Sequence, residues 1–234
     1  MPSAPANYSM RPGDIHVWQA SLASTTLALG DLSSILSAAE RERASRFIFE
    51  MDQARFASCR ASLRLLLSRY TGLAPDKIAF RYEPQGKPAL AGGVGWQFNV
   101  SHSRNLAAIA ISRYDAVGID VELIDPLFPR DEVAPDILAP DELRDLADFP
   151  ADAQPDYFFQ LWTLKEALLK AVGGGFSLDP RAIRIRLDES FNPEIISAPP
   201  DFMNATLHRF TPRPGYSGAL AVRAPVSELG FFIL

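Results

Sequence analysis

The order of the predicted elements is the feature that most constrains the fold. Apolar residues at helical spacing between residues 37 and 70 predict two helices, and three strand candidates follow. The order then recurs, with helices predicted near 140–148 and over 156–172 and three more strands after them. The six strand candidates are 77–83, 96–100, 106–112, 182–187, 203–210 and 218–224. Helices followed by three strands, twice, predict an α+β protein of two pseudo-equivalent halves with a cleft between them.

The remaining segments define the limits of these halves. A further strand is predicted at 15–22, before the first helices. The triple glycine at 173–175 is typical of a helix end. Four prolines within 125–140 exclude one regular element there, so this stretch is predicted to be an irregular crossover. We place the halves at 1–116 and 117–234.

Charge and composition exclude several classes of protein. The net charge of −5 conceals seven arginines against four acids in 40–70, and thirteen acids against two arginines in 114–156. A nucleic-acid binder usually carries a basic excess over the whole domain, so we expect no nucleic acid as partner. No apolar run has the length of a membrane span, and no secretory signal pattern opens the sequence, so the expectation is a cytoplasmic protein that does not contact membranes. One cysteine and three scattered histidines offer no zinc site, which leaves oxygen ligands for any metal.

The stretch VGIDVELID, which starts at Val117, carries the clearest local pattern. In a strand, Gly118, Asp120 and Glu122 share one face, opposite an apolar face, and the two carboxylates have Cα atoms ~6.6 Å apart. Such a pair can converge on Mg²⁺, and the missing side chain at Gly118 would leave room for a ligand. The alternative is that both acids form the solvated face of a half-buried strand.

The helix FFQLWTLKEALLKAV, 158–172, is apolar around most of its circumference and is therefore predicted to be buried. Thr163, Glu166 and Lys170 fall within a polar seam about 60° wide, while Lys165 projects about 100° from Glu166. One interpretation is an ordinary ion pair between Glu166 and Lys170, at i and i+4. The other is that the seam faces the cleft, where Glu166 joins Asp120 and Glu122 on a cation and the lysines meet phosphate.

The stretch FNVSHSRN, 98–105, places His102 between Ser101 and Ser103. It can be a polar turn between two strands or part of a serine hydrolase. A hydrolase is disfavoured because neither serine lies in a G-x-S-x-G elbow, and a Ser-His dyad is normally assembled from positions distant in sequence.

Three blocks, FNVSHS (98–103), VGIDVE (117–122) and LWTLKEALLK (161–170), together resemble the signature of surfactin-synthetase-type 4′-phosphopantetheinyl transferases. The resemblance implies two pseudo-twofold-related halves with small, mainly antiparallel sheets, and a monomer that binds coenzyme A in the cleft with Mg²⁺, or Mn²⁺, on its pyrophosphate. It also implies transfer of phosphopantetheine to a serine of an acyl or peptidyl carrier protein, as in fatty acid, polyketide or nonribosomal peptide synthesis, with release of adenosine 3′,5′-bisphosphate.

The resemblance also implies roles for individual residues. Asp120 and Glu122 match metal ligands, and Glu166 matches a third ligand or the base that deprotonates the carrier serine. Ser101 and His102 match contacts to coenzyme A phosphate. The other residues with matched roles are Lys165 and Lys170 toward phosphate, Lys87 near the nucleotide, Arg43, Arg46 and Arg55 toward the 3′-phosphate, and Glu142 as a second candidate base.

Two departures from the family pattern affect the nucleotide contacts. Some relatives have lysine where this chain has Glu40, and threonine near the position of Phe56. For the carrier protein, the 125–140 connection with Leu127, Phe128 and Ile137 is the candidate docking surface, and a plain linker is its alternative.

Two other functions stay open at the level of the sequence. The same three acids would serve a Mg²⁺-dependent phosphohydrolase or nuclease, which needs no acceptor protein. A non-catalytic module that binds coenzyme A or a carrier protein would show no turnover, and its binding would survive the loss of an acid such as Asp120.

Overall fold

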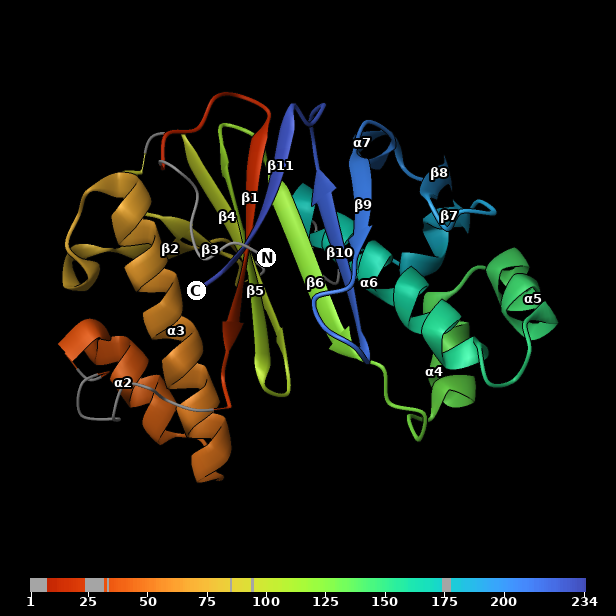
Figure 1. Cartoon of the computed structure of the whole chain (residues 1–234), viewed down its shortest axis with the longest axis horizontal. Helices are drawn as coiled ribbons and strands as arrows, with labels where there is room; N and C mark the ends of the chain where they lie inside the picture. The colour runs from red at the N-terminus through yellow and green to blue at the C-terminus, as the bar shows by residue number, and fades with distance from the viewer. Residues whose placement is uncertain (1–7, 24–31, 33, 85, 94, 174–177) are drawn as a thin grey trace.

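The computed structural model describes residues 8–23, 32, 34–84, 86–93, 95–173 and 178–234. The predictions that involve Gln85, Gly174, Gly175 and the first seven residues lie outside this part of the chain. Within it, helices and sheets form four layers, in which α3 lies on one sheet with α2 beside it, and α6 lies on a second sheet with α4 and α5 on its outer side (Figure 1).

The first half is built on a four-stranded sheet in the order β11-β1-β5-β4. Its strands pair antiparallel except for β1 and β11, which run parallel. The elements of this half are β1 (Asp14–Ser21), α2 (Ala38–Ser45), α3 (Glu50–Thr71), the hairpin β2 (Phe80–Tyr82) and β3 (Pro88–Leu90), β4 (Trp96–Ser103) and β5 (Leu106–Arg113).

The second half is built on a three-stranded antiparallel sheet in the order β6-β10-β9. Its elements are β6 (Val117–Leu123), α4 (Arg130–Ile137), α5 (Pro140–Asp148), α6 (Gln154–Val172), the hairpin β7 (Arg184–Leu187) and β8 (Pro193–Ser197), α7 (Pro200–Met203), β9 (Thr206–Phe210) and β10 (Tyr216–Val222). The α+β architecture of two halves with small sheets is therefore confirmed.

Local sequence explains where the long helices begin and end. Ser37 caps α2 in a capping box with Glu40, so each side chain bonds the other residue's backbone amide. Gly72 and Gly173 end α3 and α6 with φ values of 74° and 80°, in the left-handed region that glycine adopts without strain.

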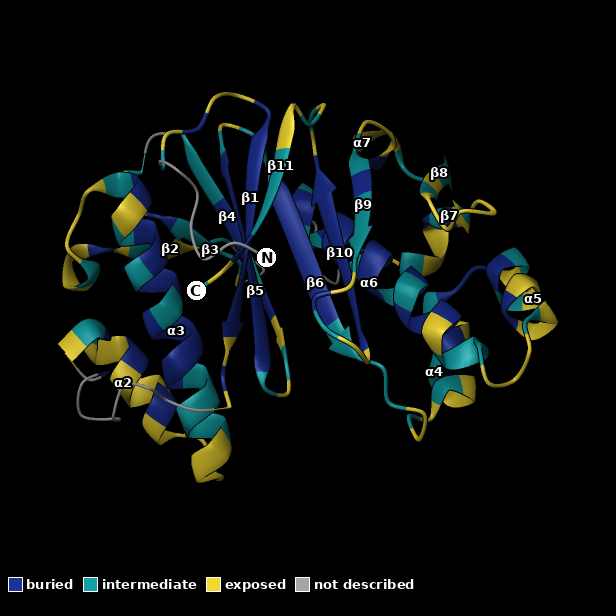
Figure 2. Cartoon of the chain, viewed as in Figure 1, coloured by how far each residue is buried: buried dark blue, intermediate teal, exposed yellow. Residues whose placement is uncertain are grey.

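Alternation along the strands creates three apolar cores. On β1, Trp18 faces α3, whereas Ile15 and Val17 pack with Ile119 and Val121 of β6 between the two sheets. A third core lies between α6 and the second sheet. Buried strands accordingly occupy the centre of the molecule and exposed residues its outer helical faces (Figure 2).

Several segments differ from the sequence predictions, and the short elements β3, β8 and α7 were not predicted. Residues Arg130–Ile137 form a helix, α4, despite Pro135 within it, because Ala134 and Leu138 are buried against the core of the second half. The last strand, β11 (Glu228–Ile233), was not predicted and lies beside β1 in the sheet of the first half. The division of the chain at 116/117 stays a prediction, with β11 returning across it.

Candidate active site

A pocket of about 370 Å³ lies where β4, β6 and α6 meet. Most of its lining was singled out from sequence. Its residues are Val100, Ser101, His102, Asp120, Glu122, Trp162, Glu166 and Lys170. Three sequence blocks that are far apart in the chain thus come together around one cavity.

Strand β6 directs its polar face toward α6. Gly118 is the point of closest approach, because a Cβ at this position would overlap the carbonyl oxygen of Ala167 and the amide nitrogen of Ala171. The prediction that Gly118 leaves room for a ligand is therefore wrong. The glycine instead lets the α6 backbone lie directly on the strand, which brings Glu166 and Lys170 within reach of Asp120 and Glu122.

Lys170 forms its ion pair across the pocket. Its Nζ donates to Oδ1 of Asp120 at 2.7 Å, so its salt bridge is with β6 and not with Glu166 on its own helix. Asp120 is only 2% exposed, and a buried carboxylate of this kind needs a positive partner. The polar seam of α6 therefore faces the carboxylates of β6, which agrees with the interpretation in which the seam faces the cleft.

Two of the three carboxylates of the pocket, Glu122 and Glu166, have a raised pKa. Burial, and then the charge of Asp120, raises the pKa of Glu122 to about 7. Burial also raises the pKa of Glu166, and the charge of Asp120 adds to the increase while Lys170 opposes it. The site thus concentrates more negative charge than one lysine neutralises.

The donor set suits a hard divalent cation. Oδ2 of Asp120 is buried and accepts no hydrogen bond from the described residues, and a buried carboxylate oxygen of this kind is stabilised by a cation or by a hydrogen-bond donor beside it. Within the ranges that the structure describes, no three histidine, cysteine or acidic side chains form a complete metal cage. Mg²⁺ needs no such cage, because it is typically held by one or two carboxylates together with water and phosphate oxygens.

Strand β4 holds β6 through side chains. The Ser101 hydroxyl donates to Oδ1 of Asp120 and the Ser103 hydroxyl donates to Oε2 of Glu122, both at 2.7 Å. Asn99 accepts a hydrogen bond from the Ile119 amide at 2.8 Å. Sequence reasoning assigned no role to Asn99 or Ser103, although the period-2 spacing of Asn99, Ser101 and Ser103 places all three on one face of the strand.

His102 lies on the opposite face of β4 from these serines, and the residue is exposed at the pocket. Partial burial of the ring lowers the pKa of His102 below its ordinary value, and the positive charges of Lys170 and Arg55 add to this effect. At neutral pH the imidazole is therefore neutral and presents one N–H donor.

The structure does not bring Lys165 and Glu142 to this pocket. Lys165 is 1% exposed, and its Nζ donates to Oε2 of Glu142 at 2.5 Å and to the carbonyls of Ile137 and Pro180. Glu142 also accepts from the amides of Ala139 and Ile185. The interpretation of Lys165 as a phosphate ligand and of Glu142 as a base conflicts with this geometry, because Lys165 lies about 140° around α6 from Lys170.

The other predicted contacts lie outside the pocket. Lys87 donates to the carbonyls of Val117 and Lys170, which ties the β2–β3 hairpin to the end of α6. Arg43 and Arg46 line a separate cavity of about 990 Å³ beside α2. Arg55 is half-buried and bonds Asn105 and Asp52.

The departures from the family pattern have structural consequences in the first half. Glu40, where some relatives have lysine, is buried in an ion pair with Arg64 at 2.7 Å at the wall of the same cavity. Phe56 packs its ring under the guanidinium groups of Arg43 and Arg60.

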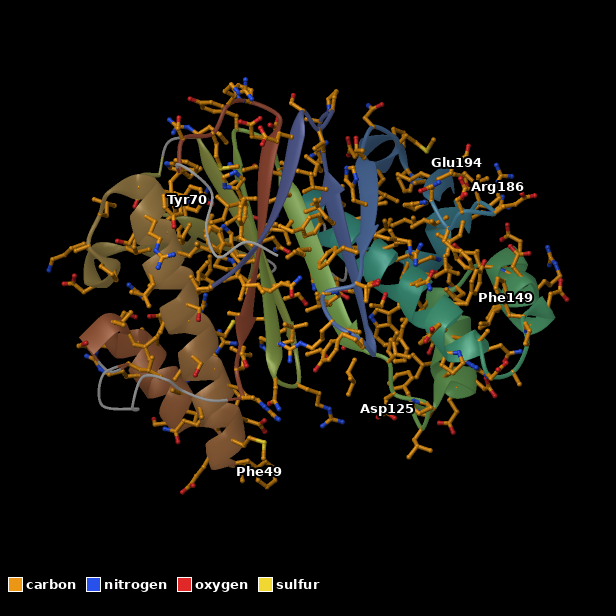
Figure 3. The ribbon with its side chains drawn as sticks, in the orientation of Figure 1. Phe49, Tyr70, Asp125, Phe149, Arg186 and Glu194 are labelled. Carbon is orange, nitrogen blue, oxygen red and sulfur yellow. The ribbon has the colours of Figure 1, made fainter. Side chains whose placement is uncertain are left out.

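The connection after β6 begins next to the pocket, and Figure 3 shows Asp125 at its start, at the lower edge of the second half. Phe128 packs against the rings of Phe158, Phe159 and Trp162, with centroid distances of 6.0, 5.5 and 5.5 Å. Leu127 is 90% exposed. The segment therefore presents an apolar side chain to solvent beside a pocket wall, Trp162.

Comparisons with known proteins identify the family of this chain. A model described as "4'-phosphopantetheinyl transferase superfamily" matches residues 116–220, and one described as "4'-phosphopantetheinyl transferase, N-terminal" matches residues 17–113. The 4′-phosphopantetheinyl transferase HetI of Nostoc sp. is 36% identical over 176 residues, which cover 74% of this chain and 74% of that protein. The chain belongs to the 4′-phosphopantetheinyl transferase family.

This phosphopantetheinyl transferase is also similar to other known proteins at lower identity. The 4′-phosphopantetheinyl transferase Sfp of Bacillus subtilis is 29% identical over 192 residues, covering 82% of this chain and 84% of Sfp. A holo-(acyl-carrier-protein) synthase from Bacillus anthracis, solved in complex with CoA, is 21% identical with a TM-score of 0.39, over 46% of this chain and 93% of that one. The family expected from the three sequence blocks is confirmed.

None of the helices in the described part of this transferase combines the length and the apolar character needed to cross a bilayer.

Proposed function

We propose that the protein transfers the 4′-phosphopantetheine group of coenzyme A to a serine hydroxyl of an acyl or peptidyl carrier protein, in a Mg²⁺-dependent reaction at the pocket between β4, β6 and α6. The observation that carries this proposal is the buried Asp120 carboxylate. One of its oxygens is held by Ser101 and Lys170, and the other, Oδ2, is buried without a hydrogen-bond partner among the described residues. Asp120 lines the pocket together with two further acids, Glu122 and Glu166.

In the proposed reaction the carrier serine oxygen attacks the β-phosphorus of coenzyme A. The new Oγ–P bond forms as the bond to the oxygen that bridges the two phosphates breaks, and adenosine 3′,5′-bisphosphate leaves with that oxygen. When bound, Mg²⁺ neutralises the charge that grows on the leaving phosphate. Asp120 and Glu122 are the residues that would hold the ion, with Glu166 as third ligand or as base.

Glu166 is the favoured proton acceptor of the two candidate bases. It lines the pocket, and its raised pKa brings its basicity closer to neutral pH, where a general base is most effective. Glu142 instead accepts hydrogen bonds from Lys165 and from two backbone amides. Lys170 and the neutral His102 supply N–H donors for the phosphate oxygens.

The first half supplies the proposed site for the rest of coenzyme A. Arg43 and Arg46 line the larger cavity beside α2, and guanidinium groups suit a phosphomonoester. The roles of Arg55 and Lys87 toward the nucleotide stay predictions, as do the monomeric state and the use of Leu127 and Phe128 to dock the carrier protein.

The decisive test is incubation with apo carrier protein, coenzyme A and Mg²⁺, followed by intact mass spectrometry of the carrier. We expect a gain of one phosphopantetheine group that is lost when EDTA is added. Asp120→Ala should lower the rate by on the order of 100-fold or more, because it removes a carboxylate from the cation and the partner of Lys170.

Glu194→Ala is the matched control for Asp120→Ala. Glu194 is an exposed acid paired with Arg186 at the outer edge of the second half, and it should be dispensable for transfer (Figure 3). Release of adenosine 3′,5′-bisphosphate without any carrier would instead identify a phosphohydrolase. Coenzyme A binding that survives Asp120→Ala, with carriers of unchanged mass, would identify a binding module.

A further inference from the structure

The outer edge of β6 is closed by side chains of β4. β10 pairs with one edge of β6, and the amides of Ile119, Val121 and Leu123 point away from it. Their acceptors are Oδ1 of Asn99 at 2.8 Å, Oγ of Ser101 at 3.4 Å and Oγ of Ser103 at 3.1 Å. Three side chains at period 2 therefore take the place of a backbone ladder, and an unpaired buried amide is avoided at each position.

The residue type at each of these three positions on β4 matches the groups of β6 that it contacts. Gly118 precedes Ile119 and has no side chain, and the residue that meets this amide, Asn99, needs only an acceptor. Ser101 and Ser103 meet amides that follow Asp120 and Glu122, and each hydroxyl also donates to the preceding carboxylate at 2.7 Å. A hydroxyl can accept one hydrogen bond while it donates another, but it has only one proton to donate.

We propose that Ser101 and Ser103 are positioning residues that fix the carboxylates of Asp120 and Glu122 for a divalent cation, an inference that rests on the proposed function. Each serine ties a carboxylate to the backbone of the same strand. The Ser101 proton is committed to Asp120, so Ser101 does not donate to a substrate phosphate. This assignment differs from the phosphate contact that the family resemblance implies for Ser101.

The two serines differ in how much their carboxylates depend on them. Oδ1 of Asp120 also accepts from Lys170, so it keeps a donor when the Ser101 hydroxyl is removed. Oε2 of Glu122 accepts from Ser103, and Lys170 is bound to Asp120. Removal of the Ser103 hydroxyl should therefore weaken cation binding more than removal of the Ser101 hydroxyl.

The test measures Mn²⁺ binding from the electron paramagnetic resonance signal of free Mn²⁺, with saturating coenzyme A and no carrier protein. A titration of coenzyme A alone gives the background. We expect Ser103→Ala to raise the dissociation constant of Mn²⁺ by about 10-fold or more, the usual effect of losing a partner of a metal ligand. Ser103→Thr keeps the hydroxyl and should stay within about 3-fold of the wild type, and Ser101→Ala should fall between the two.

Ser112→Ala separates a local effect from general destabilisation. Ser112 is fully buried on β5, on the same face of the same sheet, and its hydroxyl donates to the carbonyl of Asp115 and to no carboxylate. We expect this variant to lower the melting temperature as much as Ser103→Ala does, with Mn²⁺ affinity unchanged.

Equal Mn²⁺ affinity in the wild type and Ser103→Ala would overturn the inference, and so would a wild type that binds no Mn²⁺. The inference would also fail if Ser103→Thr did not recover the Mn²⁺ affinity lost in Ser103→Ala, or if Ser112→Ala lost the same affinity. Transfer to carrier protein is scored separately. A wild type that binds Mn²⁺ but modifies no carrier would refute the proposed function, while the comparison of Mn²⁺ affinities would still decide the role of the serines.

Discussion

At the scale of single residues, the site places three carboxylates and one lysine where few of their charges are solvated. Asp120 is paired with Lys170, and the cost of the remaining negative charge appears in the raised pKa of Glu122 and of Glu166. A carboxylate whose pKa is raised on folding binds more protons in the native state than in the unfolded state. Its effect on stability therefore has a definite sign.

In the metal-free protein, Glu122→Gln should be increasingly more stable than the wild type as pH rises. Between the ordinary pKa of 4.5 and the raised value of about 7, the unfolded chain loses the Glu122 proton more readily, so the wild type loses stability across this range. We expect the variant to gain about 2 kcal/mol relative to the wild type between pH 5 and pH 8. Urea unfolding in EDTA at both pH values measures this difference. A constant difference between the two proteins would contradict it.

At the scale of elements, helix α6 divides its two lysines between different tasks. Lys170 faces β6 and the pocket, whereas Lys165 is buried on another side of the helix, against Glu142 and two carbonyls. The sequence places both lysines after the same tryptophan, Trp162, and helical spacing shows that they diverge. Only the packing of α4 and α5 on α6 shows that a buried acid, Glu142, lies beside Lys165.

Lys165→Met and Lys170→Met should therefore differ in their effect on transfer. Lys165→Met leaves the Glu142 charge buried without its cation and should lower the free energy of unfolding by about 3 kcal/mol. Transfer by the folded protein should change little. Lys170→Met should slow transfer at least about 10-fold, because it removes a donor from the phosphate site. Unfolding curves and initial rates of both variants test this pair, and a Lys165→Met protein that is stable but inactive would contradict it.

At the scale of the whole molecule, the two halves share a core and a strand, so we expect them to unfold as one unit. Side chains of β1 and β5 pack with those of β6 and β10 in the core between the sheets. β11 follows β10 in the chain but pairs with β1, so the last strand completes the first sheet (Figure 1). The pocket depends on this arrangement because β4 and β6 belong to different sheets.

Phe232→Ala on β11 should consequently weaken both halves. Phe232 is buried against the rings of His16 and Trp18, and its truncation should cost about 3 kcal/mol. Hydrogen exchange with mass spectrometry should show that the most protected amides of α3 and of α6 lose protection by the same factor. Loss of protection in α3 alone would show that the halves unfold separately.

The sequence by itself determined much of the element order, the two-half α+β fold, the family and most of the pocket residues. Periodicity placed Asp120 with Glu122 and Glu166 with Lys170, because the 2.0 and 3.6 residue repeats are properties of the local backbone. Those intervals fix which side chains share a face of one element.

Only the tertiary structure decided which faces meet. Gly118 admits a helix backbone and not a ligand, Lys165 and Glu142 form a buried pair, and Ser101 and Ser103 hold the carboxylates of the neighbouring strand. β11 also escaped prediction, because its partner β1 lies more than two hundred residues earlier in the chain. Contacts between distant segments depend on how elements pack against one another, and local periodicity carries no record of that packing.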